Sequence, residues 1–253
     1  MLFYNLDKYD CKREYMYKVV SSFSKKSKQM NKKSKKFKTK SFKAVLFDMD
    51  GVIADSMPYH FISWFEVLKQ HNVRINPMII FEMEGAKWDK VIKLAFKQSG
   101  IPLFQQATQK IRKKREQIFN QYFKRYIFTG IPEFIKSLKN KGVLVGLVTG
   151  SSLKEAQKML PEYIYKLFDT IIAGDGVKRG KPYPDPYLAA AKNLKVLSKE
   201  CMVIENAPYG IKSAKAAKMY CCAIATSLSE DLLSEADIIF DTHRDLYEYF
   251  EGD

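Results

Sequence analysis

The sequence predicts an α/β protein built on a Rossmann-like, doubly wound parallel sheet, with a helical insert after the first strand. Residues 43–47 form a short β-branched and aromatic run that ends in acidic residues and Gly51, as a buried strand ending in a turn does. Residues 57–128 show apolar side chains at helical spacing and no strand alternation. After Gly130, short apolar runs alternate with amphipathic segments, which indicates strands joined by helices in a parallel sheet.

The individual elements can be placed in order along the chain. The insert contains three helical stretches, with breaks near Pro77, Gly85 and residues 100–102. The alternating part predicts helices at residues 132–140, 153–160, 185–194 and 207–218. It predicts further strands at residues 143–148, 170–173, 202–205, 221–225 and 237–240. No internal repeat is found.

Composition restricts the class of protein. At 253 residues and 46% apolar content, the chain can form one large domain, or a core domain with a smaller one inserted. No apolar run approaches the ~20 residues that a membrane-spanning helix needs, so we expect no membrane insertion. Asp7, Asp10 and Glu14 interrupt the N-terminal region, which argues against a signal peptide. The sequence gives no indication of oligomeric state.

The cysteines indicate a compartment. They lack the spacing of a disulfide framework or a zinc site, and two of them are adjacent inside an apolar run. The four are Cys11, Cys201, Cys221 and Cys222. We therefore expect reduced thiols in a cytoplasmic protein.

The formal net charge of +15 is concentrated at the N-terminus. Residues 1–40 contain 13 Lys or Arg and 3 acidic residues, a net charge of +10. Such a segment has little to bury, and it predicts a disordered basic arm over residues 1–42. A nucleic-acid contact, a membrane-surface contact and a nuclear import signal are alternatives. We favour a solvated tail, because blocks of like charge are commonly just disordered.

Side chains with useful chemistry stand at the ends of the predicted strands or before a later helix. Ligands of open α/β sheets bind outside the carboxyl ends of the strands, so these groups are expected to converge. They are Asp48 and Asp50, Thr149-Gly150-Ser151, Gly180-Lys181-Pro182, and Glu205-Asn206. Together they can hold a divalent cation and a phosphoryl group at once.

Each residue type suits one part of phosphoryl transfer. A carboxylate can attack phosphorus, and a second carboxylate two residues along can protonate the leaving oxygen and later activate water. Mg²⁺ and a lysine can neutralise the charge of the phosphate. Each group alone is ambiguous: acidic residues after a strand are often turn formers, and Asn206 could simply cap the next helix. Their joint placement is what favours a site.

In these motifs the sequence resembles the haloacid dehalogenase-like hydrolase superfamily, and specifically its β-phosphoglucomutase-like branch. The family's DxDG motif matches residues 48–51. Its Thr or Ser after a strand matches Thr149, its lysine motif matches residues 180–187, and its acidic pair corresponds to Glu205-Asn206. The resemblance covers about residues 43–240, with the motifs in the family's order.

The resemblance implies a role for each matching residue. Asp48 would be the nucleophile and a Mg²⁺ ligand, and Asp50 the general acid/base with its backbone carbonyl on the metal. Thr149 with Gly150, and Lys181, would hold the phosphoryl group. The metal site would be completed, directly or through water, by Glu205 and Asn206. The family more commonly has Asp at the place of Asn206, so this site has one negative charge fewer.

The resemblance also implies a division into domains. Residues 57–128 would form a cap that closes over the substrate and excludes water, while residues 43–56 and 129–253 form the catalytic core. His60 matches a position near the active site of the β-phosphoglucomutases; a partly buried helix residue is an equal alternative. Residues 84–87 match a cap loop that reads the substrate, where relatives usually carry an Arg near the position of Lys87.

Three functions are compatible with these features. The first is a Mg²⁺-dependent phosphatase acting on a small phosphorylated metabolite, such as a sugar or polyol phosphate. The second is a β-phosphoglucomutase-type mutase, which returns the phosphoryl group to the sugar. The third is a non-catalytic binding protein that uses the basic arm. We favour the phosphatase, because the cap loop lacks the expected Arg, the family is mostly phosphatases and the catalytic set is complete.

Overall fold

Residues 42–251 are described by the computed structural model, and within them six parallel strands form one sheet. The strand order is β3-β2-β1-β4-β5-β6, so the sheet is wound in both directions from β1, as the sequence predicts. The strands are β1 (Ala44–Phe47), β2 (Leu144–Val148), β3 (Thr170–Ile172), β4 (Cys201–Glu205), β5 (Tyr220–Ile224) and β6 (Ile238–Phe240). All but Phe42 of the predicted basic arm lies outside the described residues.

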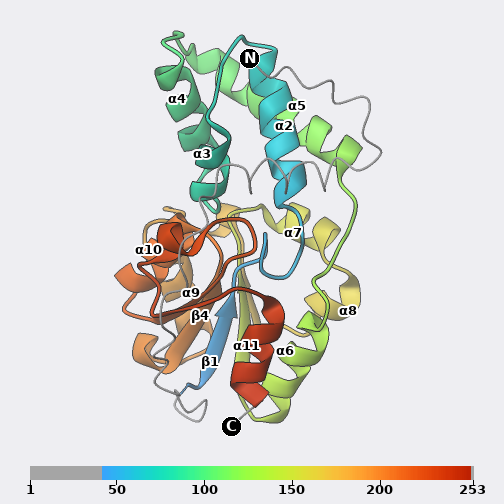
Figure 1. Cartoon of the computed structure of the whole chain (residues 1–253), viewed down its shortest axis with the longest axis vertical. Helices are drawn as coiled ribbons and strands as arrows, with labels where there is room; N and C mark the ends of the chain where they lie inside the picture. Colours follow the sequence, from blue (N-terminus) through green and yellow to red (C-terminus); the bar gives the residue numbers. More distant parts are fainter. Residues whose placement is uncertain (1–41, 252–253) are drawn as a thin grey trace.

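Helices cover both faces of this sheet (Figure 1). Successive side chains of β1 point to opposite faces. Ala44 and Leu46 join a core with α9 (Asp185–Asn193) and α10 (Pro208–Ala216). Val45 and Phe47 join a second core with helices of the other layer. These are α6 (Ile131–Asn140), α7 (Leu153–Met159), α8 (Glu162–Tyr165) and α11 (His243–Glu251).

Four helices between β1 and α6 form the helical insert, which lies above the carboxyl ends of the strands in Figure 1. They are α2 (Met57–Lys69), α3 (Pro77–Glu82), α4 (Trp88–Gln98) and α5 (Gln105–Tyr122). The two segments that connect the insert to the sheet domain pair with each other: the amide of Asp55 donates to Tyr126, and that of Phe128 donates to Ile53. The insert is therefore joined to the sheet domain through one narrow, paired connection.

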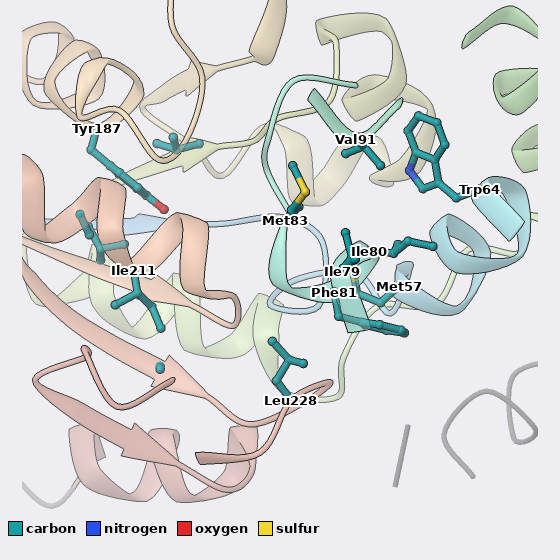
Figure 2. Close-up of a cluster of buried hydrophobic side chains, with 14 of the residues drawn as sticks. Met57, Trp64, Ile79, Ile80, Phe81, Met83, Val91, Tyr187, Ile211 and Leu228 are labelled. Atoms are coloured by element: carbon teal, nitrogen blue, oxygen red, sulfur yellow. The ribbon is translucent and has the colours of Figure 1, made fainter. Parts of the chain in front are cut away.

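Apolar packing is continuous between the insert and the sheet domain. One core cluster contains Trp64, Ile80 and Phe81 from the insert together with Tyr187 and Ile211 from α9 and α10. Figure 2 shows these side chains on both sides of the junction. The insert is thus packed against the sheet domain in this structure, which places its loops directly over the strand ends.

The structure differs from the predicted elements at a few places. The short helix α3 begins at Pro77, where the sequence suggested only a break, because Asn76 caps it by accepting from the amide of Met78 at 3.0 Å. Helices α8 and α11 were not predicted. No helix within residues 42–251 is long and apolar enough to cross a bilayer.

Candidate active site

The predicted site residues from the sheet domain come together at the carboxyl ends of the strands. Asp48 directly follows β1, Thr149 follows β2, and Glu205 ends β4. Since β1 lies between β2 and β4 in the sheet, these three positions are neighbours across the strands. All three side chains are buried, as are Asp50, Asn206 and Lys181. The prediction that these side chains lie together at the strand ends is confirmed.

Lys181 is the central cation of this cluster. Its ammonium donates to Oδ1 of Asp48, to Oε1 of Glu205 at 2.7 Å, and to the carbonyl oxygen of Val148 at 3.3 Å. Burial acts to lower the pKa of Lys181, but the two carboxylates outweigh it and the pKa lies above its ordinary value. Burial raises the pKa of Asp48 to about 8, against the opposing effect of Lys181. A further cation beside Asp48 would stabilise its ionised form.

Glu205 is held by three hydrogen bonds. Its Oε1 accepts from Lys181 and from the hydroxyl of Tyr187 at 2.7 Å, and its Oε2 accepts from the backbone amide of Asn206 at 3.0 Å. Gly210, in α10, leaves the room this carboxylate needs, because a Cβ there would lie 1.7 Å from Oε1. Both oxygens of Glu205 therefore have protein partners, and its role as a metal ligand remains a prediction.

We expect Gly210→Ala to destabilise the protein by about 3 kcal/mol, because the added methyl group forces the buried Glu205 out of its hydrogen bonds. Thermal denaturation of the variant should show a clear fall in Tm. Gly176→Ala is the matched control, since a Cβ at Gly176 meets no atom within 4 Å. An equal Tm for the two variants would contradict the fixed position of Glu205.

Asp50 is held by groups from the insert. Oδ1 accepts from the hydroxyl of Ser56 and lies 2.8 Å from Nε2 of His60. Arg115 of α5 contacts Nδ1 of His60, and because a guanidinium can only donate, the Nε2–H of His60 is left to donate to Asp50. Burial acts to raise the pKa of Asp50, but His60 and Ser56 outweigh it and the pKa is lowered. His60 therefore contacts a predicted catalytic residue.

Backbone atoms of the loop after β2 contact backbone atoms of the helical insert. The hydroxyl of Thr149 accepts from the amide of Ser151 at 3.1 Å. Gly150 lies against Gly85, and a Cβ on Gly150 would come within 2.7 Å of the Gly85 Cα. A Cβ on Gly85, where φ is +76°, would lie 2.4 Å from Cδ of Lys181. The loop of residues 84–87 is thus seated on the two segments predicted to bind phosphate.

A cavity of about 290 Å³ lies between the insert and the sheet domain. Among the residues lining it are His60, Glu84, Arg115 and Gly150. Lys87 also lines it, but its ammonium donates to the carbonyl oxygens of Val177 at 3.1 Å and Lys178 at 2.9 Å. In this structure Lys87 therefore joins the insert to a loop of the sheet domain, and its predicted contact with substrate stays a prediction.

The family model for haloacid dehalogenase-like hydrolases matches residues 45–224. The chain belongs to this family. The match runs from Val45, the second residue of β1, to the end of β5 and includes the whole helical insert.

Individual relatives of this haloacid dehalogenase-like hydrolase agree with that assignment. The phosphorylated carbohydrates phosphatase of Thermotoga maritima is 26% identical over 185 residues, which are 69% of this chain and 81% of the relative. A solved structure named as a beta-phosphoglucomutase, from Bacteroides vulgatus, has a TM-score of 0.75 and 28% identity and covers 95% of both chains. The chain also matches Suppressor of quenching 1, chloroplastic, of Arabidopsis thaliana, with 32% identity over 202 residues, 76% of this chain but 19% of that protein's length.

The donors left at the strand ends of this haloacid dehalogenase-like hydrolase fit Mg²⁺. Within residues 42–251, Oδ2 of Asp48, Oδ2 of Asp50 and Oδ1 of Asn206 are buried without a hydrogen-bond partner. The oxygens of Asp48 and Asn206 are of the kind that Mg²⁺ prefers, and Oδ2 of Asp50 is free to carry a proton. In the described part of the chain, no group of three His, Cys, Asp or Glu side chains is placed to hold a metal ion. The set of metal ligands therefore depends on the amide oxygen of Asn206. Gly51, with φ +84°, makes room for Nδ2 of that amide.

Two residues around this site were missed by sequence reasoning. Tyr187 lies at the end of the quoted lysine motif, and its hydroxyl reaches Glu205. Arg115 lies on a helix whose sequence reads as a charged surface, and its guanidinium packs over Trp64 and Phe119. Glu84 belongs to the predicted cap loop of residues 84–87 and lines the cavity. A helical wheel of α5 around its buried Ile111 and Ile118 would have placed Arg115 near the apolar side.

Proposed function

We propose that the chain is a Mg²⁺-dependent phosphatase that hydrolyses a small phosphorylated carbohydrate or polyol through an aspartyl-phosphate on Asp48. The observation that carries the proposal is the hydrogen bonding of the two carboxylate oxygens of Asp48. One oxygen is held by Lys181, while the other is buried and has no hydrogen-bond partner within residues 42–251, as is also true of one side-chain oxygen each of Asp50 and Asn206. The phosphorylated carbohydrates phosphatase among the relatives supports the substrate class.

In the first half-reaction, a carboxylate oxygen of Asp48 forms a bond to phosphorus while the bond from phosphorus to the ester oxygen breaks. Asp50, in its protonated form, gives a proton to that oxygen from Oδ2, the oxygen that Ser56 and His60 leave free, and the alcohol leaves. Lys181 offsets negative charge on the phosphoryl group, and the loop at Thr149-Gly150 contributes a hydroxyl and backbone amides. His60, bonded to Asp50 and backed by Arg115, fixes the orientation of the acid.

In the second half-reaction, water attacks phosphorus and the acyl-phosphate bond breaks. Asp50 takes the proton of this water, so Asp48 returns as a carboxylate and inorganic phosphate is released. Mg²⁺ would be held by the carboxylate of Asp48, the backbone carbonyl of Asp50 and the amide oxygen of Asn206, and when bound it would neutralise charge on the phosphoryl oxygens. The helical insert acts as the cap: its packing over the strand ends limits the entry of bulk water.

A mutase is the second candidate, favoured by the similarity to the structure named as a beta-phosphoglucomutase. We place it second because the ammonium of Lys87, the cation of the cap loop, donates its hydrogen bonds to backbone carbonyl oxygens of the sheet domain.

The buried thiols of Cys201, Cys221 and Cys222 are free, and because free thiols are typical of a reducing compartment we propose a cytoplasmic location.

Purified protein should release inorganic phosphate from a panel of sugar and polyol monophosphates in the presence of Mg²⁺, and excess EDTA should reduce that release at least about 100-fold. Phosphate should be assayed in parallel with sugar isomers. Formation of the isomer without net phosphate release would favour the mutase. Full activity in EDTA would contradict the metal assignment, and readdition of Mg²⁺ controls for irreversible loss of folding.

A further inference from the structure

The turn that carries Asp50 is closed by hydrogen bonds of its own backbone. It spans residues 49–54, directly after the predicted nucleophile. The amides of Ile53 and Ala54 both donate to the carbonyl oxygen of Met49 at 2.9 Å. Every residue of the turn is buried, so a carbonyl group that the turn does not satisfy by itself needs a donor from elsewhere in the protein.

Two side chains from the C-terminal part of the chain supply such donors. The hydroxyl of Thr226 donates to the carbonyl oxygen of Gly51 at 2.8 Å. Nε2 of His243 lies 2.7 Å from the carbonyl oxygen of Val52. Because a carbonyl oxygen can only accept, the ring of His243 carries a proton on Nε2 and donates it. Both side chains come from beyond residue 224, where the match to the family model ends.

His243 is itself fixed at the start of α11. Its ring is buried and stacks on the ring of Phe128, with 4.1 Å between the two centroids. Phe128 lies in the segment that leads from the insert back to the sheet domain. The helix is anchored by Leu246 and Phe250, which are buried in the core. His243 therefore contacts the Asp50 turn and the returning segment at once, from a position that the core determines.

We propose that His243 and Thr226 are positioning residues that keep the turn, and with it Asp50, in place for proton transfer. The inference rests on the proposed phosphatase function, in which Asp50 is the general acid. Neighbouring side chains orient the carboxyl group of Asp50, but its backbone moves with the turn. Loss of a donor leaves a buried carbonyl group unpaired, so the turn shifts toward another partner. A displacement of about 1 Å at a reacting group is enough to slow catalysis strongly.

Two phosphate esters separate this role from a general loss of structure. The phenolate of p-nitrophenyl phosphate leaves without a proton, whereas the alkoxide of benzyl phosphate needs one from the acid. His243→Phe keeps the stacking on Phe128 and removes the donor. We expect it to lower kcat/KM for benzyl phosphate about 10-fold more than for p-nitrophenyl phosphate, and Thr226→Val to show the same selective loss. His243→Gln keeps an N–H donor and should retain most of the activity toward both esters.

Asp50→Asn is the reference, because it removes the acid itself and should slow benzyl phosphate more than p-nitrophenyl phosphate. His71→Phe is the matched control: His71 is exposed just after α2, and both rates should equal those of the wild type. If His243→Phe and Thr226→Val slow both esters equally, or neither, the inference is overturned while the phosphatase stands. An equal selective loss in His243→Gln and His243→Phe would also overturn it. If the wild type hydrolyses no phosphomonoester, or Asp50→Asn spares benzyl phosphate, the proposed function itself fails.

Discussion

Asp48→Asn should abolish phosphate release, with a loss on the order of 10³-fold or more in kcat. An amide is neutral and a poor nucleophile, so no phosphoryl bond forms at this position. The fold should survive, because the amide oxygen can still accept from Lys181 and the side chain keeps its size. Phosphate release from an aryl phosphate in Mg²⁺ measures the effect, and mass spectrometry of the wild type during turnover should find the phosphoryl group on the peptide that contains Asp48.

Asp241→Asn serves as the control, because Asp241 is exposed and follows β6 at the far edge of the sheet. Its activity should equal that of the wild type. Turnover by Asp48→Asn within about tenfold of the wild type would remove Asp48 as nucleophile, and with it the covalent mechanism. A phosphoryl group found on another residue would move the nucleophile to that residue.

The fold was predictable because its signals are local. The segment around β1 carries both the apolar run of a buried strand and the carboxylates that follow it, and parallel strands bring their carboxyl ends to one edge. The groups that follow β1, β2 and β4 could therefore be placed together from residue order alone. Helix α11 was missed because nothing after the last predicted strand was assigned, although its apolar Leu246 and Phe250 stand at helical spacing.

The contacts of the helical insert were less predictable, because they depend on how it is seated on the sheet domain. Lys87 could be assigned to the cap loop by resemblance, but not to the carbonyl oxygens of Val177 and Lys178, 90 and 91 residues away along the chain. The pairing of Arg115 with His60 likewise joins two helices of the insert, α2 and α5. Such contacts follow from tertiary packing, which residue spacing within one element does not encode.

Lys181→Met should be the most destabilising single change at this site, at about 3–5 kcal/mol. Methionine can fill the space of the lysine stem, but it leaves the buried carboxylates of Asp48 and Glu205 without the ammonium that contacts both. Activity should be lost as well, because no cation remains to offset the phosphoryl charge. Chemical denaturation and phosphate release measure the two effects.

Lys139→Met is the control for removing a lysine from an ion pair. Lys139 bonds Asp169 at 2.5 Å, but both side chains are partly exposed, so we expect its loss to cost under about 1 kcal/mol. A double variant separates charge from packing: Lys181→Met with Glu205→Gln should be more stable than Lys181→Met alone, because it removes one of the two uncompensated charges and keeps the acceptor for Tyr187. If the second change instead adds to the loss, packing of the lysine stem, and not its charge, is what stabilises this site.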